Sequence, residues 1–172
     1  KIMAVATSAA RDVQNAHELE AICSAHNIPI QIISGDKEAE LTFKGAISGQ
    51  KINSEGAALA LAVLDIGGGS TEIIIGNENQ LLSSKSIDIG AVRITEMFFN
   101  EQPPKRNEIL EAIKFIDEKL DIYFSKNQPK PTKIIAVAGT PTELVSAKVG
   151  GYDPKKVDNY QLTLDEIKKY ID

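Results

Sequence analysis

The sequence is poor in the residue types that build disulfide frameworks and zinc sites. Its 172 residues include one cysteine, Cys23, and two histidines, His17 and His26. A single cysteine has no disulfide partner within the chain, and it supplies only one of the four ligands of a structural zinc site. The histidines stand nine positions apart with no other residues at metal-ligand spacing. Neither an internal disulfide nor a zinc centre is therefore expected, which fits a reducing cytoplasmic compartment.

Long apolar runs and an excess of positive charge are absent as well. No stretch approaches the roughly 20 apolar residues of a membrane-spanning helix, and no basic-then-apolar signal segment opens the chain. Nineteen Lys and Arg residues face 24 Asp and Glu residues, so the formal net charge is −5. An acidic domain is a poor general binder of nucleic acid, because phosphate groups repel it. We therefore expect neither a membrane nor a nucleic acid among the partners.

What is present is the pattern of a packed α/β protein. The hydrophobic fraction of 42% and the charged fraction of 25% are ordinary for a globular domain. Periodicity and turn signals predict strands at 2–7, 30–33, 60–66, 71–76, 80–87 and 134–138. They predict helices at 15–26, 36–47, 91–99, 107–126 and 139–149, and a last helix at the capping box of Thr163 and Glu166. The strands between 60 and 87 are expected to form an antiparallel meander, with ligand loops at one edge of the sheet.

The sharpest motif is the segment Asp65-Ile66-Gly67-Gly68-Gly69-Ser70-Thr71-Glu72. Three consecutive glycines allow positive φ and let backbone N–H groups approach a ligand, and the two hydroxyls can donate to phosphate oxygens. The two flanking carboxylates suit Mg²⁺, which prefers a few carboxylates together with phosphate oxygens. The alternative is a glycine-rich hairpin with solvated acids. The turn is longer than the favoured two-residue hairpin loops, which points toward a ligand.

Three further segments are weaker when each is taken alone. Gly139 and Thr140 lie between a predicted strand and helix, where N–H groups can bind an anion, although Thr140 could equally be an ordinary N-cap before Pro141. Glu38 lies in the first turn of a predicted helix, where a carboxylate usually only complements the helix dipole. Arg11 follows a strand end and could bind phosphate with its guanidinium, although a surface arginine is the commoner explanation.

Together these motifs resemble the exopolyphosphatase/guanosine pentaphosphate phosphohydrolase (Ppx/GppA) family. The resemblance rests on Ala6-Thr7-Ser8-Ala9-Ala10-Arg11, Ile33-Ser34-Gly35-Asp36-Lys37-Glu38-Ala39, Asp65 to Glu72, Ile89-Gly90-Ala91-Val92-Arg93 and Ala138-Gly139-Thr140, in this order. It implies an α/β, actin-like ATPase (ribonuclease H-like) fold with a mixed sheet and a phosphate chain held between two lobes. Residues 1–48 would be a remnant of the first lobe, and residues 49–172 would be the second lobe, truncated at its C-terminal end.

The resemblance also implies roles for individual residues. Glu38 would be the catalytic carboxylate, and Asp65 and Glu72 would hold Mg²⁺. The phosphate-binding residues would be Arg11, Gly67, Gly68, Gly69, Ser70, Thr71, Gly139 and Thr140. The family's first phosphate loop, Asp-x-Gly-Ser-Asn-Ser, is not found in these residues, so a fragment is expected. Lys37 stands where an acid is common and Glu40 where many members carry arginine, so the charge near Glu38 is expected to differ.

The function implied is Mg²⁺-dependent hydrolysis that releases terminal phosphate from inorganic polyphosphate or guanosine pentaphosphate, with Glu38 assisting the attacking water. The alternative is a phosphate- or nucleotide-binding module of the actin-like kinase and ATPase class that performs no turnover. The pairing of Ser34 to Glu38 with the Gly67 to Thr71 loop favours the hydrolase. A homodimer is left open.

Overall fold

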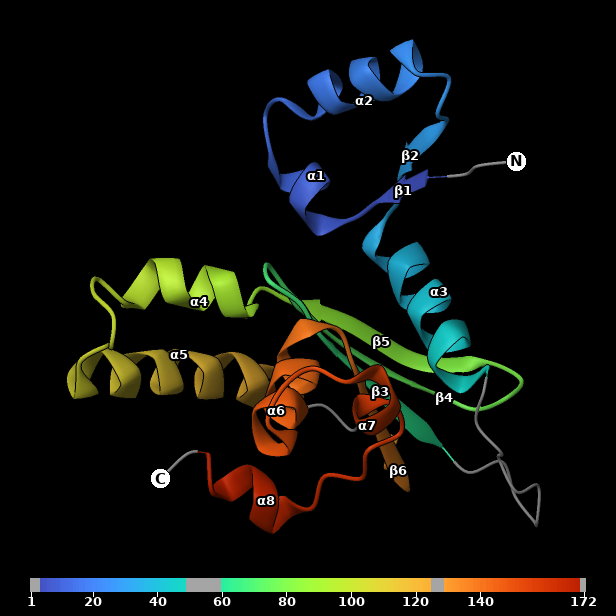
Figure 1. Ribbon diagram of the computed structural model, residues 1–172. Helices are drawn as coiled ribbons and strands as arrows, with labels where there is room; N and C mark the ends of the chain where they lie inside the picture. Colours follow the sequence, from blue (N-terminus) through green and yellow to red (C-terminus); the bar gives the residue numbers. More distant parts are fainter. Residues whose placement is uncertain (1–3, 49–59, 125–128, 171–172) are drawn as a thin grey trace.

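Two β-sheets organise the chain (Figure 1). The computed structural model describes residues 4–48, 60–124 and 129–170. In the smaller sheet β1 (Ala4–Ala6) pairs in parallel with β2 (Ile30–Ile32). Parallel neighbours require a crossover connection, and α1 (Ser8–Asp12) and α2 (Ala16–Ala25) supply it.

The larger sheet has four strands in the order β5-β4-β3-β6. Its members are β3 (Leu61–Ile66), β4 (Thr71–Gly76), β5 (Leu81–Ile87) and β6 (Lys133–Val137). The first three form an antiparallel meander, and β6 runs parallel to β3. The predicted meander, continued by the strand that contains Ile134, is therefore confirmed.

Helices cover both faces of the larger sheet. On one face lie α4 (Ala91–Phe98) and α5 (Arg106–Phe124), and on the other lies α3 (Gly35–Ile47). The pleat divides neighbouring residues of β4 between the two cores. Ile73 packs with the α4 and α5 side chains, whereas Ile74 packs with Ala39 and Phe43 of α3. Every second residue of the central strands therefore faces α3.

Three helices complete the chain: α6 (Gly139–Val149), α7 (Pro154–Val157) and α8 (Leu164–Lys168). The predicted capping box is confirmed, since Thr163 accepts a hydrogen bond from the Glu166 N–H and Glu166 accepts one from the Thr163 N–H. An ion pair between Lys148 and Glu166 joins α6 to α8. Among the described residues, no helix has the length and apolar content needed to cross a bilayer.

The differences from the sequence-based expectation concern short elements and one boundary. The expectation lacked α1 and α7, because five and four residues are too few to show a helical period. The polar, Gly/Ser-rich stretch 48–56 is the segment that the sequence favours as a linker, and most of it lies outside the described residues. The division at 48/49 stays a prediction, but α3, on its N-terminal side, packs against the larger sheet. Each of the other predicted elements has a counterpart in the structure.

Candidate functional site

Two of the predicted phosphate-binding segments leave the larger sheet at the same edge. The segment 67–70 follows β3, and Gly139 follows β6. Because β3 and β6 are parallel neighbours, with Asp65 paired to Val137, their carboxyl ends lie side by side. This edge is where ligands of open α/β sheets bind.

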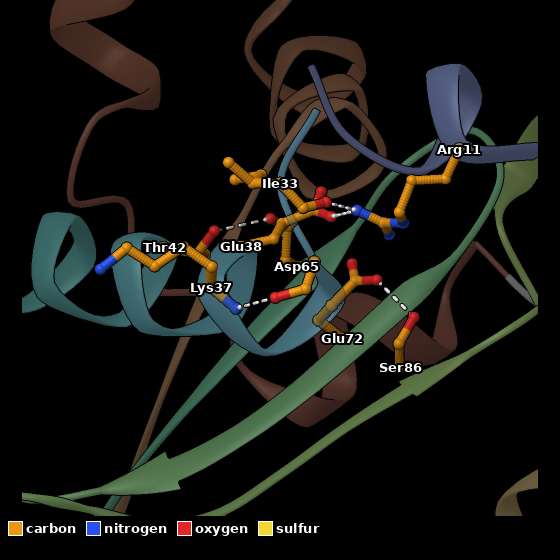
Figure 2. A network of polar contacts seen from close by, with 9 residues as sticks. Arg11, Ile33, Lys37, Glu38, Thr42, Asp65, Glu72 and Ser86 are labelled. Atoms are coloured by element: carbon orange, nitrogen blue, oxygen red, sulfur yellow. Dashed lines mark hydrogen bonds and ion pairs between the residues drawn. The ribbon is translucent and has the colours of Figure 1, made fainter. Parts of the chain in front are cut away.

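Asp65 and Glu72 are direct cross-strand neighbours on β3 and β4. Each stands two residues from a core residue that packs on α3, so both carboxylates lie on the α3 face of the sheet. Glu72 is only 4% exposed and accepts a 2.6 Å hydrogen bond from the Ser86 hydroxyl of β5. The Thr42 hydroxyl of α3 lies 3.5 Å from Asp65 Oδ2, which is a long hydrogen bond (Figure 2).

The environment of Asp65 disfavours its charged form. Partial burial is the largest cause that raises the pKa of this carboxyl, and the negative charges of Glu72 and then Glu38 raise it further. Asp65 thus lies close enough to both glutamates for their negative charges to act on it. Within the described ranges, no three His, Cys, Asp or Glu residues form a metal centre. A Mg²⁺ ion held by Asp65 and Glu72 would need its remaining ligands from phosphate and water, and this predicted role stays a prediction.

Glu38 reaches the same region from the first turn of α3. The Ser34 hydroxyl caps this helix by accepting from the Lys37 N–H at 3.3 Å. Arg11 Nη1 donates to Glu38 Oε2 at 2.9 Å and also to the carbonyl oxygen of Ile33 at 2.8 Å. The side chains of Glu38 and Arg11 are 14% and 25% exposed. Arg11 thus joins α1 and the segment after β2 to the predicted catalytic carboxylate (Figure 2).

The two charges that depart from the family pattern interact with each other. Glu40 accepts from Lys37 Nζ at 2.9 Å and from Lys44 Nζ at 2.6 Å. These hydrogen bonds, the one from Lys44 foremost, lower the pKa of Glu40 to about 2. Lys37 is therefore paired within α3, so the extra positive charge beside Glu38 is largely neutralised by Glu40.

The glycine loop has a different reason for its composition than the one expected. The predicted positive φ is wrong: within the described ranges, only Gly150 and Gly151 among the glycines have positive φ. At Gly68 the constraint is steric, because α4 lies against the loop there. A Cβ on Gly68 would lie 3.2 Å from Val92 Cγ2, and a Cβ on Gly90 would lie 2.3 Å from the Gly68 oxygen.

Some polar groups of this loop are already hydrogen-bonded within the protein, and others remain available to a ligand. The Gly67 N–H closes the turn by donating to the Ser70 carbonyl at 3.0 Å. The Thr71 hydroxyl is buried and donates to the Ile89 carbonyl at 3.2 Å. The N–H groups of Gly68 and Gly69 have no protein acceptor in the part of the chain that the structure describes. Backbone N–H groups are thus the loop's available donors, and phosphate binding by Ser70 and Thr71 stays a prediction.

The second predicted phosphate loop, at Gly139 and Thr140, does not have the ordinary N-cap that the sequence left open. Ala138, with φ of 74°, is the N-cap of α6, and Gly139 is the first helical residue. Thr140 is therefore inside the first turn and is not the N-cap. Both Gly139 and Thr140 are exposed, and a Cβ on Gly139 would contact nothing within 4 Å. The space around Gly139 and Thr140 would admit a ligand, and their phosphate-binding role stays a prediction.

Three residues at the site had no predicted role: Thr42, Ser86 and Arg93. Thr42 follows Glu38 by four positions, so helical spacing alone places them on one face. Ser86 could be found only from the strand register, which pairs it with Glu72. Arg93 contacts the glycine loop from α4, with its Nε donating to the Gly69 carbonyl at 2.7 Å.

Comparisons with known proteins point to one family. The model of the Ppx/GppA phosphatase family matches residues 1–172. Exopolyphosphatase 2 of Mycobacterium tuberculosis is 39% identical over 127 residues, which is 70% of this chain and 38% of that protein. The solved Ppx/GppA family member of Aquifex aeolicus has 32% identity and a TM-score of 0.76, covering 98% of this chain and 53% of that one.

A solved exopolyphosphatase of Cytophaga hutchinsonii has 29% identity and a TM-score of 0.81, covering 98% of this chain and 55% of that one. The chain therefore spans about half of the solved proteins and less of the curated relative. Motif order, sheet topology and these matches lead to one conclusion: the chain belongs to the Ppx/GppA phosphatase family and has its α/β, actin-like fold.

Proposed function

We propose that this chain contributes the catalytic carboxylate and a phosphate loop to a hydrolase that releases terminal phosphate from inorganic polyphosphate. The observation that carries the proposal is the meeting of Glu38, from α3, with the cross-strand pair Asp65 and Glu72 of the sheet (Figure 2). This group lies next to a loop with available N–H groups. The name of the Mycobacterium tuberculosis relative, exopolyphosphatase 2, supports polyphosphate as the substrate.

The reaction is the transfer of a terminal phosphoryl group to water. The water oxygen forms a bond to the terminal phosphorus, the bond from that phosphorus to the bridging oxygen breaks, and the shortened polyphosphate leaves with the bond's electron pair. Such transfers need an oriented nucleophile and neutralisation of the phosphoryl charge. In our proposal Glu38 orients the water and accepts its proton, while N–H groups of the glycine loop contact the phosphate oxygens.

In this proposal Arg11 acts on both the base and the substrate. In the structure its Nη1 already holds Glu38 Oε2 and the Ile33 carbonyl. A guanidinium carries five donors in a planar fork, so further N–H groups remain for a phosphate oxygen. We therefore assign Arg11 the double role of fixing Glu38 and contacting the phosphate chain.

A divalent cation fits the acidic pair. Mg²⁺ bound at Asp65 and Glu72 would neutralise charge on the phosphate oxygens. Asp65 would contribute its half-buried carboxylate, and Glu72 would be kept in place by Ser86. Guanosine pentaphosphate offers the same kind of terminal phosphoanhydride bond, and it is retained as a second substrate of the same chemistry.

The test measures phosphate release by the full-length protein that contains these residues. Polyphosphate and guanosine pentaphosphate are supplied separately, each with Mg²⁺ and with a chelator. A parallel assay measures ATP-dependent phosphorylation of sugars, the activity expected of an actin-like kinase. Release from polyphosphate that requires Mg²⁺ supports the proposal. If the protein binds polyphosphate but releases no phosphate from it, the proposal is overturned in favour of a binding module. If it phosphorylates sugars instead, the proposal is overturned in favour of a kinase.

A further inference from the structure

The first turn of α4 binds the protein's own glycine loop. A helix N-terminus normally leaves its first N–H groups free for a cap, water or an anion. Here the Ala91 N–H donates to the Gly67 carbonyl at 2.9 Å, and the Arg93 N–H donates to the Gly68 carbonyl at 3.0 Å. The Gly90 N–H, at the cap position, donates to the Gly69 carbonyl at 3.3 Å. Three of the four N–H groups from Gly90 to Arg93 are therefore committed to the loop.

The Arg93 side chain adds the shortest of these contacts. Its Nε donates to the Gly69 carbonyl at 2.7 Å, so one residue holds two successive carbonyls, one through its backbone and one through its side chain. The guanidinium also lies 3.9 Å from Asp88, measured between Nη2 and Oδ1. We call the two contacts of Arg93 with the Gly68 and Gly69 carbonyls the clamp. Because the arginine side chain is 35% exposed, the clamp lies at the border between the loop and solvent.

Fixing the carbonyls decides where the loop's N–H groups point. In a planar trans peptide, each carbonyl and the N–H of the following residue point in opposite directions. The Gly67 and Gly68 carbonyls face α4, so the N–H groups of Gly68 and Gly69 point away from it. The Gly69 carbonyl is held by Arg93, which orients the N–H of Ser70 in the same way. The clamp thus presents successive N–H groups on the side of the loop away from α4.

We propose that Arg93 is a positioning residue of the phosphate loop: by holding the Gly68 and Gly69 carbonyls, it turns the N–H groups of Gly69 and Ser70 toward the substrate phosphates. The inference rests on the proposed function, because it takes phosphate oxygens as the acceptors of these N–H groups. It adds a residue that acts through the loop and does not itself contact the substrate.

The test compares Arg93→Ala and Arg93→Lys with the control Arg106→Ala in the full-length protein. Arg106 is an exposed arginine at the start of α5, so its removal takes away the same charge without touching the loop. Both Arg93 variants are expected to raise the KM for polyphosphate about 10- to 100-fold, the range of a hydrogen bond from a charged group. The effect on kcat should be smaller, since the loop contacts phosphate in the ground state and the transition state alike.

Lysine separates charge from geometry, because it keeps the positive charge but places a methylene where Arg93 has Nε. Calorimetric titration with tripolyphosphate measures the same loss without turnover. The clamp also has a readout that needs no ligand: amide hydrogen exchange at Gly90, Ala91 and Arg93. Their N–H groups donate to the loop carbonyls, so both Arg93 variants should exchange faster there and the Arg106→Ala control should not.

The outcomes separate this inference from the proposed function. If the wild-type protein releases no phosphate from polyphosphate, the proposed function fails, while tripolyphosphate titration and amide exchange still decide the clamp. If wild-type affinity and exchange persist in Arg93→Ala, the clamp is overturned. Full rescue by Arg93→Lys, or an equal loss in Arg106→Ala, would show that only the charge acts and would overturn it as well.

Discussion

Arg11 and Glu38, 27 positions apart in the sequence, form an ion pair with 2.9 Å between Nη1 and Oε2. The same nitrogen donates to the carbonyl oxygen of Ile33, the residue after β2. One guanidinium nitrogen therefore ties the predicted catalytic carboxylate to the smaller sheet. The position of Glu38 depends on α1, on the end of β2 and on the cap of α3 together.

Replacing this arginine by lysine should harm catalysis although the charge is kept. An ammonium is a point charge without the planar fork that serves Glu38, Ile33 and a phosphate at once. We expect Arg11→Lys to lower kcat for polyphosphate at least about tenfold, because misplacement of a catalytic group is costly. Steady-state kinetics of the full-length variant measure this, with Arg106→Lys as the control. Unchanged kcat would remove Arg11 from the site.

Neutralising the predicted base should act on turnover and leave binding nearly intact. Glu38→Gln keeps the size of the side chain and removes its ability to accept a proton, so kcat should fall about 10²- to 10⁴-fold. Polyphosphate affinity, measured separately, should change by less than about threefold, because the base acts mainly in the transition state. Glu111→Gln, at an exposed position of α5, is the control. Near wild-type turnover in Glu38→Gln would reduce Glu38 to a helix-dipole residue.

The ionised carboxylate of Asp65 should lower the free energy of unfolding at neutral pH when Mg²⁺ is absent. Its pKa is raised in the folded state by burial and by Glu72 and Glu38, so the native form binds its proton more tightly than the unfolded chain does. Stability from this group is present below the unfolded pKa and is lost as the pH rises through the folded pKa.

Asp65→Asn is therefore expected to raise the free energy of unfolding at about pH 7 and to leave it almost unchanged at about pH 3, below the ordinary pKa of aspartate. Urea unfolding in the presence of a chelator measures the difference, and Asp117→Asn on the exposed side of α5 is the control. The same Asp65 variant should lose Mg²⁺-dependent phosphate release. A variant that is destabilised at neutral pH would contradict this account of the carboxylate.

Gly90 should tolerate no side chain, because the loop backbone occupies the space. A Cβ there would lie 2.3 Å from the Gly68 oxygen, so Gly90→Ala should cost about 1–3 kcal/mol of unfolding free energy, as overpacking does. Gly45 in α3 is the matched control, since its Cβ would contact nothing within 4 Å. Gly45→Ala should stabilise by about 0.5–1 kcal/mol. Equal effects of the two substitutions would contradict the close packing of α4 on the loop.

Sequence reasoning succeeded where structure follows from local periodicity. The short apolar runs of β3 and β4, bounded by turn signals, predicted strands, and the Thr163 and Glu166 spacing predicted the start of α8. It was least informative for short segments such as α1, where no period can be read. For the glycine loop it emphasised the freedom of the backbone, whereas the constraint at Gly68 is steric and comes from Val92 of α4.

By itself, the sequence determined the class of fold, the order of the motifs and the residue types available for phosphate chemistry, because turns, caps and strand periods depend on near neighbours. Only the tertiary structure decided which groups meet. The meeting of Glu72 with Ser86 depends on the β4–β5 register, and that of Asp65 with Glu38 on the packing of α3 over the sheet. The clamp of Arg93 on Gly69 joins residues 24 positions apart. Such contacts follow from strand pairing and core packing, which act between residues distant in the chain.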